Sequence, residues 1–183
     1  FQERPGLIQA VSTAKKKSKF RRIVYFPLVL LLVLLILVYN PVSVRLMTLS
    51  AAVIYGLDPG IFYRLINTES RFRSFAVSPA QAIGLGQVQE STASYVHMSH
   101  RRGMLYFPPY NLSISARYLN YLHGRFGNNW TLVLAAYNWG ESNVGRRMSG
   151  IRIDPEADYR ERFSDIRETY GYINKIMPPA KKA

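Results

Sequence analysis

The longest hydrophobic run in the chain lies near its start and contains no charged residue. It covers residues 23–39 (IVYFPLVLLLVLLILVY), and every residue from 28 to 36 is Leu, Val or Ile. As a helix, this run would span about 26 Å, close to the thickness of a bilayer's hydrocarbon core. It is longer than the apolar part of a cleaved signal peptide, and no small-x-small cleavage pattern follows it. We therefore predict an uncleaved transmembrane helix over residues 23–39.

Basic side chains flank this run mainly on one side. Residues 15–22 (KKKSKFRR) precede it directly, whereas only Arg45 follows closely. Because cytoplasmic flanks carry the excess of Lys and Arg, the N-terminus is predicted to be cytoplasmic and the rest of the chain to lie outside. The predicted layout is a cytoplasmic basic segment (1–22), the transmembrane helix (23–39), an extracytoplasmic domain (40–177) and a C-terminal tail (178–183).

Beyond the span, apolar residues recur at helical spacing, and no useful strand-like alternation is found. Asp58-Pro59 is a typical helix start, with Asp as the N-cap and Pro in the first turn. Residues 100–110, which include Pro108-Pro109, are predicted to form a linker. The predicted fold class is all-α, with about five to seven helices in residues 43–177. The main expected segments are 43–55, 59–70, 90–98, 111–126, 130–137 and 168–177.

Glu69 lies on the apolar face of the helix predicted over residues 59–70. The apolar positions of that face are Ile61, Phe62, Leu65 and Ile66. Glu69 is the next position of the same stripe. Burial near the negative end of the helix dipole would raise the pKa of its carboxyl. A solvent-facing Glu at a frayed helix end is the alternative that this pattern leaves open.

Composition excludes several kinds of chemistry. The chain has 183 residues, a formal net charge of +13 and no cysteine. It therefore has no disulfide framework, zinc–thiolate site or cysteine nucleophile. Residues 1–22 contribute +6 and residues 23–177 only +5, so the folded domain is not expected to bind nucleic acid. His97 and His100 lack a third ligand nearby, and we predict neither a metal site nor a cofactor.

Residues 69–87 (ESRFRSFAVSPAQAIGLGQ) combine polar, small and glycine positions in a specific order. This order resembles the signature of soluble-lytic-transglycosylase-like peptidoglycan enzymes, which runs Glu-Ser-x-Phe and then Ala-x-Ser-Pro-x-x-Ala-x-Gly-Leu-Met-Gln. Three more blocks resemble later parts of that family's pattern, in the family's order: NLSISARYL (111–119), AAYNWG (135–140) and ETYGYI (168–173). Together, the four blocks extend over essentially the whole predicted outer domain.

The resemblance implies a goose-lysozyme-like helical fold with a groove for a peptidoglycan glycan strand. It also implies cleavage of the β-1,4 bond between N-acetylmuramic acid and N-acetylglucosamine without net addition of water, which leaves a 1,6-anhydro ring. By the family's motif, Glu69 is the single catalytic acid and base. Hydrolytic glycosidases usually need two carboxylates, and the nearest upstream acid, Asp58, is already predicted as an N-cap.

The same motifs imply which residues bind substrate. Ser78, Gln87 and Gln89 are expected to line the groove. Tyr137 and Asn138 are expected to border the catalytic carboxyl, and Tyr172 with Glu168 to close the far wall. Spacing alone would favour core packing for Tyr137 and Tyr172, and only the resemblance favours a place in the site.

Five positions depart from the family's usual pattern. Gly is usual at position 81, Met at 86 and 89, Pro at 90 and Gly at 115, where this chain has Gln81, Gly86, Gln89, Glu90 and Ser115. Gly86 and Gln89 are expected to open or rehydrate the site beside Glu69. Ser115 is expected to need more room at a helix crossing.

The leading hypothesis is a single-pass enzyme of the bacterial inner membrane, or a phage-encoded equivalent, with a periplasmic domain that acts on peptidoglycan glycan strands. Opening the wall for an envelope-spanning assembly is a further hypothesis. Two alternatives stay open. One is a peptidoglycan-binding scaffold with little turnover, and the other is a hydrolase of the same fold with Glu141 or Glu168 as its second carboxylate.

Overall fold

The computed structural model describes residues 5–179 and divides the chain into two units, Phe1–Asn40 and Pro41–Ala183. Residues 1–4 of the predicted basic segment and 180–183 of the predicted tail lie outside the described residues. The described part of the first unit consists of one helix, α1 (Pro5–Tyr39). Within α1, the 19 residues Arg21–Tyr39 form the one stretch among the described residues that is long and apolar enough to cross a membrane.

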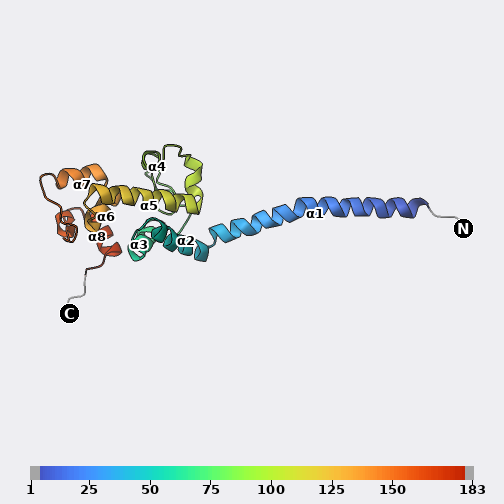
Figure 1. Ribbon diagram of the computed structural model, residues 1–183, viewed down its shortest axis with the longest axis horizontal. Helices are drawn as coiled ribbons and strands as arrows, with labels where there is room; N and C mark the ends of the chain where they lie inside the picture. Colours follow the sequence, from blue (N-terminus) through green and yellow to red (C-terminus); the bar gives the residue numbers. More distant parts are fainter. Residues whose placement is uncertain (1–4, 180–183) are drawn as a thin grey trace. The chain divides into compact units, whose positions relative to one another are not determined.

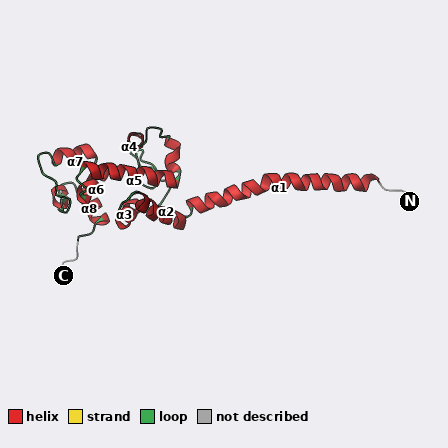
Figure 2. Ribbon diagram, in the orientation of Figure 1, coloured by secondary structure: helices red, strands yellow, loops and turns green. Residues whose placement is uncertain are grey.

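The second unit consists of helices joined by loops (Figure 2). Its α-helices are α2 (Pro41–Ile54), α3 (Pro59–Ser70), α4 (Glu90–Val96), α5 (Pro108–Arg125), α6 (Trp130–Trp139), α7 (Glu141–Arg147) and α8 (Arg167–Ile176), and its 3₁₀ helices are η1 (Arg102–Tyr106) and η2 (Arg160–Phe163). Helix α5 runs through the middle of this unit and contacts α2, α4 and α6 (Figure 1). The all-α prediction is confirmed, since the described residues contain only isolated β-bridges.

Two hydrophobic clusters hold this unit together. The larger one joins α2, α3, α5, α6 and α8, and its fully buried members include Val44, Phe62, Leu119, Leu134 and Ile173. The smaller one lies beneath the irregular segment that follows α3. Its members are Ile83, Val88, Ala93, Leu105 and Ile114. Because it includes Ile114 of α5, the smaller cluster attaches an otherwise irregular segment to the central helix.

The helix boundaries confirm some predictions and correct others. Asp58 caps α3 as predicted, because its Oδ1 accepts a hydrogen bond from the Ile61 amide at 2.7 Å, with Pro59 as the first helical residue. The predicted linker over residues 100–110 was wrong. It contains η1, and Pro108 begins α5, where a missing backbone N–H costs least. Helix α7 was not predicted, because its residues (ESNVGRR) are mostly polar and include Gly145.

Asn111 connects the irregular segment to α5. Its side chain is fully buried, and its Nδ2 donates hydrogen bonds to the carbonyls of Ile83 and Leu105, both at 2.9 Å. Its Oδ1 accepts from the Gly86 amide at 2.8 Å. A Cβ on Gly84 would lie 2.4 Å from Asn111 Nδ2, so the buried position of the Asn111 side chain also requires glycine at position 84.

We predict that Asn111→Asp destabilises the Pro41–Ala183 unit by about 3 kcal/mol or more, because it removes both donors and buries a charge beside two carbonyl oxygens. Asn120→Asp on the same helix is the matched control. Asn120 is exposed and donates one hydrogen bond, to the Tyr55 carbonyl, so we expect a loss below about 1 kcal/mol. Urea denaturation of both variants measures the difference, and equal losses would contradict the role of Asn111.

Candidate active site

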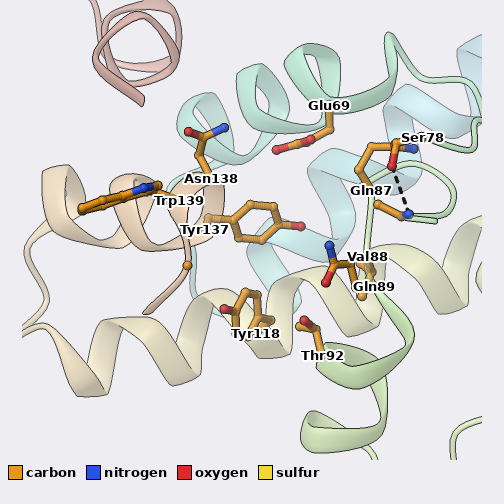
Figure 3. Close-up of a pocket in the computed structure, with 12 residues that line it drawn as sticks. Glu69, Ser78, Gln87, Val88, Gln89, Thr92, Tyr118, Tyr137, Asn138 and Trp139 are labelled. Atoms are coloured by element: carbon orange, nitrogen blue, oxygen red, sulfur yellow. Dashed lines mark hydrogen bonds between the residues drawn. The ribbon is translucent and has the colours of Figure 1, made fainter. Parts of the chain in front are cut away.

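Glu69 reaches a cavity of about 470 Å³ from the last turn of α3. In Figure 3 its carboxylate projects towards Tyr137 of α6, while Tyr118 and Thr92 lie on the opposite wall. The residues that line the cavity are Glu69, Ser78, Ala82, Gln87, Val88, Gln89, Thr92, Tyr118, Tyr137, Asn138, Trp139 and Gly140. Glu69 is the one carboxylate in this lining set.

Burial sets the protonation of Glu69. It raises the pKa of the carboxyl from 4.5 to about 7, and the neighbouring charge of Glu168 acts in the same direction. The hydrogen bond from Tyr172 and the charge of Lys175 lower the pKa, but by less. The predicted rise in the pKa of this carboxyl is confirmed, although Glu69 itself is only half-buried because it faces the cavity. At neutral pH such a group is present in both protonation states, as a group that first donates and then accepts a proton requires.

Helix α8 supplies the direct partner of this carboxyl. The Tyr172 hydroxyl donates a hydrogen bond to Glu69 Oε1 at 2.5 Å. Burial raises the pKa of Tyr172 well above its usual value, and the negative charge of Glu69 adds to this effect. Tyr172 therefore stays protonated and remains a donor to Glu69. Helix α8 also orients Asn138, whose Oδ1 accepts from Thr169 Oγ1 at 2.8 Å, which leaves the Asn138 amide nitrogen as its donor towards the cavity.

The backbone after Glu69 turns through conformations that L-residues rarely adopt. Arg71 and Phe72 have φ values of 53° and 60°, and Gln81 and Gln87 have φ values of 61° and 48°. These are four of the five non-glycine residues with positive φ in the described part of the chain. Such residues cost of order 1–3 kcal/mol each and are held by their surroundings. They all lie in the segment that follows Glu69, so the backbone of this segment takes a conformation that costs stability and forms one side of the cavity.

Gly86 and Ser115 pack closely against Tyr137, which lines the cavity. The Tyr137 hydroxyl donates to the Gly86 carbonyl at 2.7 Å, and Ser115 Oγ donates to the Asn111 carbonyl at 2.9 Å. A Cβ on Gly86 would lie 2.0 Å from Ser115 Oγ and 3.0 Å from the Tyr137 hydroxyl. The space expected to open at Gly86 is therefore already filled by Ser115. The two departures from the family's pattern are complementary, and the expectation that Gly86 opens the site was wrong.

The structure gathers most of the predicted substrate-binding residues in one place. Ser78, Gln87, Gln89, Tyr137 and Asn138 all line the cavity, whereas Tyr172 touches it through Glu69. Part of their hydrogen-bonding capacity is used internally. Ser78 Oγ accepts from the Ala82 amide at 3.0 Å, and Gln87 Nε2 donates to the Gly84 carbonyl at 2.9 Å.

The two candidates for a second carboxylate lie elsewhere. Glu168 is exposed and is not among the residues that line the cavity. Glu141 lines an adjoining cavity of about 290 Å³, together with Tyr95 and Tyr118, and pairs with Arg125 at 3.7 Å.

Sequence reasoning assigned no role to Thr92, Tyr118 or Trp139, all of which line the cavity. A signal was present for Tyr118, because it is the Tyr of the NLSISARYL block on α5. Its ring lies 5.5 Å from that of Tyr137, and burial raises its pKa to about 12. For Thr92, nothing in the local pattern distinguishes a cavity-facing threonine from one on the solvent side of a short helix.

The helical fold and its single cavity carboxylate are those of a lysozyme-like transglycosylase domain. The chain belongs to the Transglycosylase SLT domain family, which it matches over residues 47–157, more than half of its length. It is 32% identical over 117 residues to the soluble lytic murein transglycosylase of Escherichia coli K12. It is 31% identical over 138 residues to the membrane-bound lytic murein transglycosylase C of Cronobacter sakazakii.

The similarity covers most of this chain but only part of each relative. The aligned regions are 60% and 68% of this chain, and 18% and 34% of the two relatives. Among solved structures, an inactive mutant of the lytic transglycosylase Slt from Pseudomonas aeruginosa has the same fold, with a TM-score of 0.64 at 24% identity. That match covers 77% of this chain and 24% of the other. The family match over residues 47–157 includes Glu69.

The raised pKa of Glu69 predicts a pH-dependent gain in stability for Glu69→Gln. Since the folded-state value of about 7 exceeds 4.5, folding favours the protonated carboxyl, and this contribution is lost as the pH rises towards 7. The variant should therefore gain about 1–3 kcal/mol over the parent between pH 4.5 and pH 8. Urea denaturation of the Pro41–Ala183 unit at several pH values measures this gain, with the exposed Glu156→Gln as control. A pH-independent difference would show that Glu69 is not held protonated.

The fit between Gly86 and Ser115 predicts non-additive mutations. Gly86→Ala should cost about 2 kcal/mol through overpacking, and Ser115→Gly about 1 kcal/mol through lost helix propensity. In the double variant the new Cβ occupies the space vacated by Ser115, so its loss should be smaller than the sum by about 1–2 kcal/mol. Urea denaturation of the three variants measures the coupling, and strict additivity would contradict it.

Proposed function

We propose that this protein is a membrane-anchored peptidoglycan lytic transglycosylase. It cleaves the β-1,4 bond between N-acetylmuramic acid and N-acetylglucosamine without water and leaves 1,6-anhydro ends. The observation that carries the proposal is Glu69, a carboxyl with a pKa of about 7 and the one acid among the described residues that line its cavity. Family membership and the names of the relatives support the same activity.

One carboxyl suffices for this reaction if the substrate supplies the nucleophile. Protonated Glu69 donates its proton to the leaving glycosidic oxygen. The 2-acetamido group of the sugar stabilises the developing positive charge. The Glu69 carboxylate then removes the proton of the 6-hydroxyl as that oxygen closes the anhydro ring. Tyr172 holds the carboxyl in place throughout, because its hydroxyl donates to Oε1 in either protonation state.

The polar residues of the cavity bind the glycan strand in this proposal. The Asn138 amide nitrogen donates to an acetamido or sugar oxygen, since its Oδ1 is already occupied by Thr169. Gln89, where Met is usual in the family, provides a polar contact on the wall formed with Thr92 and Tyr118. Ser78 and Gln87 complete the loop side of the groove.

Helix α1 anchors the enzyme in the inner membrane in this proposal, with its N-terminus in the cytoplasm and the catalytic unit in the periplasm. The uncharged run of residues 23–39 and the basic residues before it support this topology. The relatives named membrane-bound support the anchoring. An anchored enzyme cuts only the wall within reach of the membrane, which suits the opening of a passage for an envelope-spanning assembly.

Purified sacculi incubated with the full chain in detergent test the reaction. We expect anhydro-muropeptides, one water lighter than the corresponding reducing products, by mass spectrometry. Glu69→Gln should lower their release by at least about 100-fold, because the proton donor is lost. The control Glu156→Gln changes an exposed loop carboxylate and should leave the release unchanged.

Two other outcomes would replace the proposal. Reducing-end products that disappear in Glu141→Gln or Glu168→Gln would identify a hydrolase with a second carboxylate. Binding to sacculi without soluble products would identify a scaffold.

A further inference from the structure

Helix α2 presents apolar residues on two different faces. Its core face carries Val44, Thr48, Ala51 and Ala52, all buried. On the other face, Leu46 is 60% exposed, Val53 71% and Ile54 76%, and Leu49 lies between them at 38%. Leu46, Leu49 and Val53 are spaced i, i+3 and i+7, so they form one continuous stripe. Single exposed apolar residues are common in folded proteins, whereas a contiguous apolar patch marks an interaction surface.

A second apolar feature adjoins this stripe. A cavity of about 280 Å³ lies where α2 meets the start of α5. Its lining residues are Met47, Ser50, Ala51, Ile54, Tyr55, Pro109, Leu112 and Ser113. Ile54, which is exposed next to the stripe, also lines the cavity, so the stripe and the cavity form one apolar surface. The hydroxyls of Tyr55 and Ser113, which are hydrogen-bonded to each other, are polar groups on this surface.

The two helices that form this surface carry charges of one sign. Neither α2 nor α5 contains Asp or Glu. Arg45 of α2 and Arg117 of α5 are exposed, and their guanidinium groups lie over the rings of Phe72 and Tyr55. An apolar helix face bordered by arginines matches the boundary of an anionic bilayer, where acyl chains meet phosphate groups.

The covalent connection identifies the partner. Only Asn40 separates the last residue of α1 from the first residue of α2. Two peptide units span less than about 8 Å, so α2 begins at the membrane surface once α1 crosses it. We propose that the α2 surface docks on the outer face of that membrane, with Leu46, Leu49, Val53 and Ile54 at the level of the headgroups. This inference rests on the proposed membrane span of α1.

Single-cysteine labelling of the full chain tests the proposal, since the chain has no native cysteine. Leu46→Cys and Val53→Cys probe the stripe, and both positions are exposed, so the core is left intact. Met98→Cys is the matched control, because Met98 is a 96% exposed apolar residue outside α2. Leu31→Cys reports on the span itself. Each variant carries an environment-sensitive fluorophore and is reconstituted in phosphatidylcholine–phosphatidylglycerol vesicles.

We expect the labels at positions 46 and 53 to show blue-shifted emission that is quenched by lipids brominated near the headgroup, and the label at 98 to show neither effect. If position 31 is shielded within the bilayer while 46 and 53 behave like 98, the docking inference is wrong and the span stands. If position 31 is also exposed to water, the proposed membrane span of α1 is wrong, and the docking inference that rests on it is wrong as well. Blue shifts at 46 and 53 that vanish on dilution of the protein in lipid would identify a second copy of the chain as the partner and overturn lipid docking.

Discussion

The buried amide of Asn111 sets the geometry of the whole site. Three backbone groups outside α5 form hydrogen bonds with this one side chain: the carbonyls of Ile83 and Leu105 and the amide of Gly86. Gly86 in turn accepts from Tyr137, so the position of a cavity wall on α6 depends on a side chain of α5. The segment between α3 and α4 lacks regular secondary structure. Its position is therefore fixed by the hydrogen bonds of Asn111 and by the small apolar cluster beneath it.

The position of the Glu69 carboxyl lowers the stability of the fold. Glu69 continues the apolar stripe of Phe62, Leu65 and Ile66, a position where an aliphatic side chain would be more stable. The left-handed residues Arg71 and Phe72 follow it directly. The ring of Phe72 is nevertheless buried and packs against Tyr63, with centroids 4.8 Å apart. The same stretch of chain is thus strained in its backbone and well packed in its side chains, which holds the carboxyl in one place.

Much of this arrangement could be predicted from the sequence. Helical periodicity gave the fold class and the buried face of α3, and the Asp58-Pro59 pair gave the start of that helix. The linker at 100–110 was mispredicted because proline is tolerated both in loops and in the first turn of a helix, so Pro108 alone does not distinguish the two. The fit of Gly86 with Ser115 could not be predicted, since no local rule relates two residues 29 positions apart. Their complementarity exists only where the loop meets α5.

The contact between Tyr172 and Glu69 joins residues 103 positions apart, from the second and the last α-helix of the Pro41–Ala183 unit. Because synthesis proceeds from the N-terminus to the C-terminus, Glu69 is present in the growing chain well before α8 is. Until α8 packs against α3, the Glu69 carboxyl lacks the Tyr172 hydroxyl that holds its Oε1 in place. The final geometry of the cavity therefore depends on the last helix of the unit, which packs against both α3 and α6, and a chain that stops short of α8 leaves the site unfinished.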